Sequence, residues 1–337
     1  MAFQSGNFTA SQLTTALVKA DRMWSDENQR RDFEANIDIW KTIKAEQTAD
    51  VSILEDGEKD RDVKVYWATM CGETAQDCVD GEDDCDLAGN ELGSDSKTYE
   101  LTKCKKWSFS VDEIAFRKNH FSFEDIVAKG FLKADKIISE AVAGTALPRI
   151  ESFKGVNKVT NGIGTVNATT TETDIQATDM NERMFAYLYR VAKLNELSNP
   201  FLLSGNNLFE ERLITMLSRE NAEGKGAAEL YKLFRTYFDL FNVDIGTAEK
   251  TYLINRGAIA FASKNYYGET PRMYKMQDRY SIASRHMEGH RIDVYYTNRC
   301  AGDKIMHDFK FKMKYDYFLN PTGCDADQTG VLAFNKV

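Results

Sequence analysis

The sequence predicts an α+β protein built around one long helix and a pair of long antiparallel strands. Apolar residues recur every three or four positions over residues 122–143, which is the period of a helix with one buried face. Over residues 309–317, apolar and charged side chains alternate, which is the period of a strand with one buried face. Residues 292–296 also alternate, and they are predicted to pair with that strand.

Residues 1–45 are predicted to form an N-terminal arm. A helix with a narrow apolar stripe, suited to docking on another element, is expected from residue 11 to about residue 24. Further apolar residues between 33 and 43 lie in a charged context without a clean period, and they indicate a segment that crosses a surface. The two sets are Leu13, Ala16, Leu17, Ala20 and Trp24, and Phe33, Ile37, Ile39, Trp40 and Ile43.

Two alternating runs, residues 63–67 and 107–111, predict strands that pair as the legs of a long hairpin. Residues 68–104 would then form its elaborated tip. This region is strongly acidic: residues 71–100 hold ten Asp and Glu against one Lys, which equals the net charge of −9 of the whole chain. An acidic insertion that projects from a folded body suggests contacts with other subunits.

The long helix is predicted to begin after Ser122, a residue type that caps helix N-termini, with Glu124 and Asp125 in its first turn. It should end at Gly144. At 1.5 Å per residue, such a helix spans roughly 30 Å, so we expect it to be the spine of the fold. Its predicted buried face consists of Phe123, Ile126, Val127, Phe131, Ala134, Ile138 and Ala141.

The remaining segments predict a mixed α/β middle and a strand at the end of the chain. Residues 155–178 are rich in Gly, Thr and Asn, which indicates a loop with short strands. The chain has only four prolines and no visible repeat or linker, so we expect no freely hinged domains. Helices are predicted at 180–197, 207–219 and 227–234, and short strands at PFLLSG, YFDLFNVD, KTYLIN, GAIAFAS and VLAF.

Composition, hydropathy and charge argue against several classes of protein. The 337 residues are 42% hydrophobic and 28% charged, which is ordinary for a globular chain of one elongated domain or two joined subdomains. No apolar run approaches the ~20 residues of a membrane helix, and the N-terminus lacks the pattern of a signal peptide, so folding in the cytoplasm is expected. The absence of a Lys/Arg surplus argues against a nucleic-acid-binding protein.

Four of the six cysteines, Cys71, Cys78, Cys85 and Cys104, fall in or beside the acidic insertion. Six, six and eighteen residues separate them, whereas structural zinc sites use pairs two to four residues apart. Free thiols are favoured, but disulfides formed after release from the cell and weak metal binding stay open as alternatives.

Three weaker signals have ordinary explanations. Residues 80–91 resemble a calcium loop in charge, but Cys85 stands where the loop needs Gly, so a solvated acidic tip is expected. Cys300 and Cys324 are predicted to be packed residues. GIGTVN at residues 162–167 lacks the third Gly, the strand and the helix of a dinucleotide site.

The histidines do not predict a catalytic site. His286 and His290 are four residues apart in HMEGH, but the Glu is central rather than beside either His, so a pair in a turn is expected instead of a metal site. His120 and His307 are isolated in the sequence. We therefore predict no catalytic, cofactor-binding or metal-ligating residues, no cofactor and no enzymatic activity.

Several stretches resemble a known family. They are residues 97–142 (KTYELTKCKKWSFSVDEIAFRKNHFSFEDIVAKGFLKADKIISEAV), NPFLLSGNNLF, YLINRGAIAFAS, RIDVYYTNRC and FLNPTGCDADQTGVLAFNKV. In these stretches and in the order of its elements, the chain resembles the major capsid proteins of tailed bacteriophages with the Hong Kong 97 type of fold. The acidic cysteine insertion is similar to that of phages infecting Bacteroidetes. The resemblance covers nearly the whole chain.

The resemblance implies a structural protein of the virion that self-assembles, in the host cytoplasm, into hexamers and pentamers of an icosahedral head. It implies portal and other head proteins as partners, with a separate scaffold or decoration protein as a further candidate. The head would enclose DNA without sequence-specific binding. The implied parts are an arm at 1–45, an extended loop at 46–112, a peripheral domain at 113–152 and 268–318, and an axial domain at 153–267 and 319–337.

Two other classes compete with this interpretation. A metal-binding soluble protein or metal-dependent enzyme could use the acidic cysteine loop or HMEGH, and it would carry stoichiometric metal. A different virion or sheath component would form rings or tubes in place of closed shells.

Overall fold

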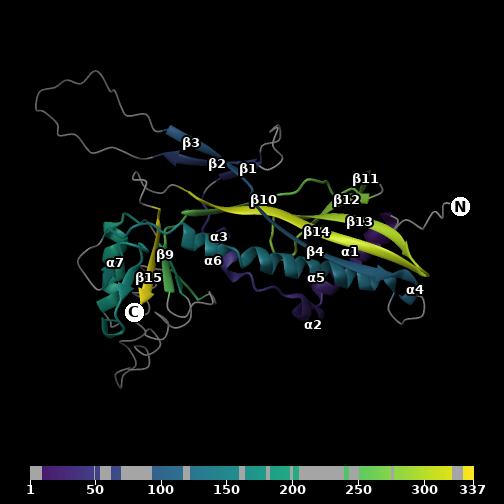
Figure 1. The fold of residues 1–337 in the computed structure, drawn as a ribbon, viewed down its shortest axis with the longest axis horizontal. Helices are drawn as coiled ribbons and strands as arrows, with labels where there is room; N and C mark the ends of the chain where they lie inside the picture. Colours follow the sequence, from purple (N-terminus) through teal and green to yellow (C-terminus); the bar gives the residue numbers. More distant parts are fainter. Residues whose placement is uncertain are drawn as a thin grey trace, which may run out of the picture.

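The protein has an elongated α+β fold, as predicted (Figure 1). A long helix lies along a six-stranded sheet, a second six-stranded sheet lies at one end, and a three-stranded sheet projects from the body. The computed structural model describes residues 10–48, 50–53, 62–69, 93–116, 122–158, 164–179, 183–197, 200–204, 239–242, 250–274, 277–320 and 329–337.

The predicted spine helix is confirmed as α5 (Phe123–Ala143). It begins with a capping box, in which the Ser122 hydroxyl accepts from the Asp125 N–H at 3.2 Å and the Asp125 carboxylate accepts from the Ser122 N–H at 3.1 Å. Phe123 and Ile126 of the predicted face are half-buried against the core. The buried apolar residues of the helix are Val127, Ala128, Phe131, Leu132, Ala134, Ile138, Val142 and Ala143.

The large sheet covers the apolar side of α5. Its strands β10 (Ile259–Lys264), β14 (Lys304–Leu319), β13 (Arg291–Ala301), β12 (Gln277–Ala283) and β11 (Arg272–Tyr274) follow in that order, and β4 (Lys103–Asp112) pairs with the other edge of β14. Both predicted long strands are therefore confirmed as an antiparallel pair, with Val294 opposite Phe311. The buried row of β14 is Phe309, Phe311, Met313, Tyr315 and Tyr317.

The projecting sheet corrects the predicted hairpin. It consists of β1 (Asp50–Ile53), β2 (Asp62–Thr69) and β3 (Gly93–Glu100), so the second leg of the hairpin is β3 and not residues 107–111. Residues 107–111 lie in β4 instead. This strand pairs with β14, where the Phe109 ring stacks on that of Phe309 with ring centroids 5.1 Å apart. The base of the hairpin packs on the body through Val63, Tyr99, Leu101, Ala260, Ala262 and Phe318.

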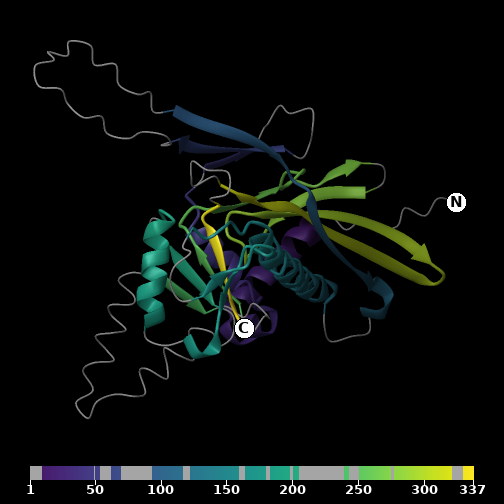
Figure 2. The ribbon, with the colours of Figure 1, turned by 60° about the vertical axis from the view of Figure 1, so that its left-hand side comes forward.

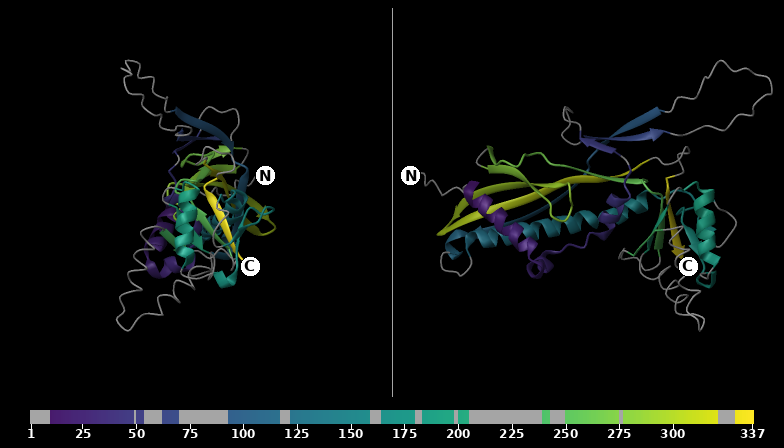
Figure 3. Two further views of the ribbon diagram at one scale, coloured as in Figure 1. Left: turned by 90° about the vertical axis from the view of Figure 1, so that its left-hand side faces the viewer. Right: turned by 180° about the vertical axis from the view of Figure 1, so that it is seen from behind.

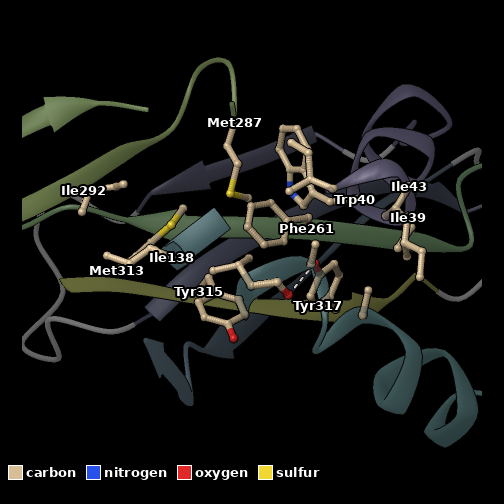
Figure 4. Packing of buried hydrophobic residues seen from close by; sticks show 14 of the residues in the cluster. Ile39, Trp40, Ile43, Ile138, Phe261, Met287, Ile292, Met313, Tyr315 and Tyr317 are labelled. Carbon is tan, nitrogen blue, oxygen red and sulfur yellow. Dashed lines mark hydrogen bonds between the residues drawn. The ribbon is translucent and has the colours of Figure 1, made fainter. Parts of the chain in front are cut away.

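The N-terminal segment packs on its own chain. Helix α1 (Ala10–Ser25) lies against α5, and it is followed by α2 (Glu27–Arg30), η1 (Arg31–Phe33) and α3 (Asp38–Ala45). Residues 38–45, part of the segment predicted to cross a surface without a clean period, form helix α3, and Ile39, Trp40 and Ile43 are buried. Trp40 packs edge-on against Phe261 with ring centroids 5.7 Å apart (Figure 4).

The second large sheet lies at one end of the molecule (Figures 2 and 3). The predicted helix at 180–197 is confirmed as α7 (Arg183–Leu194), and its residues Tyr187, Leu188 and Val191 pack on this sheet. The helices predicted at 207–219 and 227–234 lie outside the described residues. The strand order is β5 (Thr165–Val166), β6 (Thr173–Ile175), β15 (Val331–Lys336), β9 (Lys250–Ile254), β7 (Phe201–Ser204) and β8 (Asp239–Asn242).

Three short helices complete the described chain, and no helix in it has the length and apolar character needed to cross a membrane. They are α4 (Glu113–Phe116), α6 (Ala146–Ser152), which joins the spine to the second sheet, and η2 (Ala177–Asp179).

Candidate functional site

The cysteines are the first predicted candidates. Cys104 lies on β4 as an exposed free thiol, while Cys71, Cys78 and Cys85 lie outside the described residues, together with the acidic stretch 80–91. The disulfide and metal alternatives for those three stay predictions. The predicted packing of Cys300 is wrong: this thiol is exposed, because it lies at the end of β13 where the strand turns into β14. Cys324 lies outside the described residues.

His286 and His290 do lie in a turn, as predicted, between β12 and β13. They have different partners: His290 Nδ1 lies 2.7 Å from Ser263 Oγ, and His286 Nε2 donates to the Phe33 carbonyl oxygen at 2.9 Å. Burial, with a contribution from Lys44, lowers the pKa of His290 to about 4, so its ring is neutral at pH 7. No group of three His, Cys, Asp or Glu side chains is placed to hold a metal in the described part of the chain.

His307, isolated in the sequence, is buried and has two polar partners in the structure. Its Nδ1 lies 2.8 Å from the Tyr296 hydroxyl, and its Nε2 lies 3.2 Å from the Glu113 carboxylate. The side chain stands on β14 at the point where α4 and the start of α5 meet the sheet, and the Phe123 ring lies 4.7 Å from its own. These contacts are structural links between elements.

Asp135 is a buried carboxylate that apolar periodicity did not reveal. It lies on α5, fully buried, and accepts from the Ser284 hydroxyl at 2.6 Å and the Arg285 N–H at 2.7 Å. His286 Nδ1 is 3.3 Å from its second oxygen. Burial alone would raise the pKa of Asp135, but the interactions with His286, Ser284 and Arg285 lower it overall. The carboxylate therefore joins the spine to the β12–β13 loop.

A second charged cluster joins α6 to the second sheet. Lys154 and Lys250 both contact Glu172, at 2.6 and 2.7 Å, and both contact Glu151, at 2.6 and 3.1 Å. The Tyr252 hydroxyl donates to Glu151 at 2.6 Å. Burial opposes ionisation of Glu151, but these donors lower its pKa to about 2. Opposite charges balance within the cluster, which suits a rigid joint between the spine and this sheet.

The face of the large sheet that points away from α5 carries lysines and tyrosines. Lys310, Lys312 and Lys314 stand on β14 between the buried aromatic residues, so they share the opposite face. Their ammonium groups lie over tyrosine rings: Lys310 is 6.0 Å from the centroid of Tyr295, and Lys314 is 5.1 Å from that of Tyr266. We call this surface the lysine face.

Neighbouring strands extend the lysine face. By register, Lys106 of β4 stands beside Lys312, and Lys264 of β10 stands beside Lys314. A cavity of about 500 Å³ opens at the end of β14 nearer the β13–β14 turn. The polar residues that line it are Ser108, Ser110, Gln277, Tyr295, Thr297, Arg299, Asp308 and Lys310. The alternate lysines of KFKMKY mark the lysine face in the sequence, although their alternation with apolar residues predicted only a half-buried strand.

The comparisons with known proteins give matches among solved structures only. No protein-family model and no curated protein matches the chain. The matching structures include chains of several bacteriophages. A chain of Mycobacterium phage Adephagia has a TM-score of 0.46 and 11% identity, over 88% of this chain and 90% of that one. A chain of the cyanophage A-1(L) capsid asymmetric unit has a TM-score of 0.44 and 12% identity, over 82% and 87%. A chain of the cyanophage P-SCSP1u capsid structure has a TM-score of 0.42 and 8% identity, over 85% of each chain.

Proposed function

We propose that this chain is a major capsid protein of the Hong Kong 97 type, which self-assembles into hexamers and pentamers of an icosahedral phage head. Its role is structural and not enzymatic. The observation that carries the proposal is the hairpin of β2 and β3, which is anchored at one end and projects from the body at the other (Figure 1). A hairpin of this kind gains buried surface only when another subunit covers it.

The anchoring of this hairpin supports a fixed direction of projection. Val63 and Leu101 are buried against Ala260 and Phe318 at its base, and the Tyr99 hydroxyl donates to the Leu319 carbonyl oxygen at 3.1 Å. A projection held rigidly at its base loses little conformational entropy when it binds a neighbour. An element that makes the same contact between all neighbouring subunits of a shell requires this rigid anchoring.

The two sheets support a division into two domains. In our proposal, residues 113–152 and 268–318 form the peripheral domain around α5, and residues 153–267 and 319–337 form the axial domain around the second sheet. Strands β4 and β10 are exceptions to these bounds: both pair with β14, so we assign them to the peripheral domain. The arm is 1–45 and the extended loop 46–112. Portal and other head proteins, with a scaffold or decoration protein, are the proposed partners in the virion, which encloses DNA without sequence-specific contacts.

The test is particle formation by the purified chain. We expect hexamers, pentamers or closed shells by light scattering and negative-stain electron microscopy across salt and protein concentration. Tubes or open rings would favour a sheath component, and stoichiometric metal in elemental analysis would favour a metal-binding protein. A chain that stays monomeric, also when co-expressed with the other head proteins of its source, would contradict the proposal.

A shortened hairpin gives a matched variant. Replacement of residues 71–92 by a short turn leaves β2 and β3 intact. We expect a subunit with unchanged circular dichroism and impaired assembly. The control replaces the same residues by an uncharged linker of equal length, which separates the effect of charge from that of length.

A further inference from the structure

The cavity on the large sheet has a polar lining that two neighbouring cross-strand rows supply. Each row takes one residue from β4, one from β14 and one from β13, in the register of these strands. Phe109 and Phe309 also line the cavity, but their rings pack on the opposite side of the sheet, so the strand backbones form its floor. The two rows are Ser110, Asp308 and Thr297, and Ser108, Lys310 and Tyr295.

Further along the lysine face, the charged residues are engaged within the chain. Lys312 stands opposite Asp293 in the register of β13 and β14, and its ammonium group lies 5.9 Å from the centroid of the Tyr266 ring. Lys314 lies over the same ring at 5.1 Å. The segment that joins β10 to β11 therefore covers both ammonium groups. The cavity lies beyond this segment, toward the β13–β14 turn, and it has a different environment.

Side chains with spare hydrogen-bond donors converge on the cavity. In the part of the chain that the structure describes, the Ser108 hydroxyl has no hydrogen-bond partner and Lys310 makes no ion pair. The Gln277 amide oxygen accepts a hydrogen bond at 3.4 Å, while its NH₂ group has no partner among these residues. Arg299 donates to Asp308 through Nε at 2.6 Å and through neither terminal nitrogen. These four side chains can therefore donate to a ligand.

The charges around the cavity leave one positive charge unbalanced. Arg299 and Asp308 neutralise each other. Lys310 is exposed, and its ammonium group lies 6.0 Å from the centroid of the Tyr295 ring. A carboxylate has about four acceptor positions, and Arg299 and Ser110 occupy only two of those on Asp308, so Asp308 can also accept from a ligand hydroxyl. A ligand that fits these groups has one negative charge, several oxygen acceptors and hydroxyl groups.

We propose that this cavity binds an acidic sugar, with the sugar carboxylate beside Lys310 and ring hydroxyls on Ser108 and Asp308. Sugar hydroxyls both donate and accept, which suits a lining that holds a carboxylate beside cationic donors. The volume of about 500 Å³ lies within the range of small-molecule sites. An apolar ligand would gain little from a polar lining, and a nucleic-acid strand would bring its phosphates against Asp308. The site goes beyond the proposed function, since it needs neither a second copy nor a shell.

The test is the binding of glucuronate to the full-length chain, measured by isothermal titration calorimetry at low salt. We expect saturable binding that weakens as the salt concentration rises. Glucose has the same ring without the carboxylate, so it should bind about two- to fivefold more weakly, which is the contribution of one exposed ion pair. Acetate has the charge without the hydroxyls. It should bind at least about tenfold more weakly, since each lost hydrogen bond costs about two- to tenfold in affinity.

Two pairs of variants locate the site. Lys310→Gln should reduce the affinity for glucuronate about two- to fivefold and change that for glucose much less. Its control, Lys106→Gln, removes an exposed lysine from the same face outside the cavity and should have no effect. Ser108→Phe fills the cavity and should abolish the binding of both sugars. Its control, Cys104→Phe, adds the same ring at an exposed position on the same face of β4, and thermal denaturation checks that each variant folds.

A measurement on the wild-type chain decides the matter even if a variant does not fold. Glucuronate should slow the acylation of Lys310 by an amine-reactive reagent, followed by mass spectrometry, and should leave that of Lys106 unchanged. The proposal is overturned if glucuronate does not bind, if glucose or acetate binds equally well, if a folded Ser108→Phe variant binds as the wild type does, or if Lys310 is acylated equally fast with and without glucuronate. Failure of the chain to form shells would leave all these outcomes unchanged.

Discussion

Replacement of Asp135 by Asn tests whether this carboxylate holds the spine to the β12–β13 loop. Asp135 is fully buried and accepts hydrogen bonds from Ser139, Ser284 and the Arg285 N–H at 3.2, 2.6 and 2.7 Å. Asn has nearly the same shape but presents an NH₂ group in place of one oxygen. That group would face either the Arg285 N–H or the Ser284 hydroxyl.

The expected loss of stability is about 3–4 kcal/mol. A buried backbone N–H without an acceptor costs about 1–3 kcal/mol, and each hydrogen bond to a buried charged group contributes about 1.5–3 kcal/mol. The two costs overlap, because Asn still accepts one hydrogen bond. The control is Asp21→Asn: Asp21 pairs with Arg285 at 2.7 Å, but its side chain is 68% exposed, so its loss should cost less than about 1 kcal/mol.

Urea unfolding followed by circular dichroism measures both variants. The folded-state pKa of Asp135 lies below its ordinary value, so the carboxylate stabilises the wild type above about pH 4, and this contribution is lost as the pH falls through the folded-state pKa. Asp135→Asn should remove that pH dependence. If Asp135→Asn costs no more than Asp21→Asn, the carboxylate does not hold the loop and the reasoning is refuted.

Two further predictions concern stability. Burial raises the pKa of Asp293 to about 6, so stability should fall by up to about 3 kcal/mol as the pH rises from about 4 to 6, and Asp293→Asn should remove this fall in thermal denaturation between pH 4 and pH 8. A Cβ at Gly130 would lie 2.3 Å from the Phe109 ring, so Gly130→Ala should lose about 1–3 kcal/mol. Gly144→Ala, whose Cβ would meet nothing closer than 3.3 Å, is its control. A stabilised Gly130→Ala variant would contradict this packing.

Local periodicity predicted the elements that have many turns or many alternations. Helix α5 and strand β14 are long enough for one buried face to dominate their patterns. Helix α3 was missed because its eight residues give two turns, too few for a period to emerge from a charged context. The predicted pairing of residues 107–111 was wrong for a different reason: the partner of Phe109 is Phe309, and a local pattern contains nothing about a strand two hundred residues away.

The surroundings of the buried polar residues could not be predicted from the sequence for the same reason. Asp135 interrupts the apolar face of α5, and its donors Ser284 and Arg285 are about 150 residues distant. If these donors are not known, an acidic residue on a helix is expected to face solvent. Only the fold shows that two serines, a backbone N–H and a histidine surround this carboxylate.

Strand β14 uses its two faces for different tasks. Its odd-numbered residues, Phe309 to Tyr317, are buried against the helical layer and stabilise the subunit, while Lys310, Lys312 and Lys314 extend from the opposite side. Because successive side chains of a strand point in opposite directions, substitutions on one face leave the packing of the other face intact. The same nine-residue alternation that predicted a half-buried strand therefore encodes a buried face and a charged face. We expect substitutions at Lys310 to cost much less stability than substitutions at the adjacent, fully buried Phe309 and Phe311.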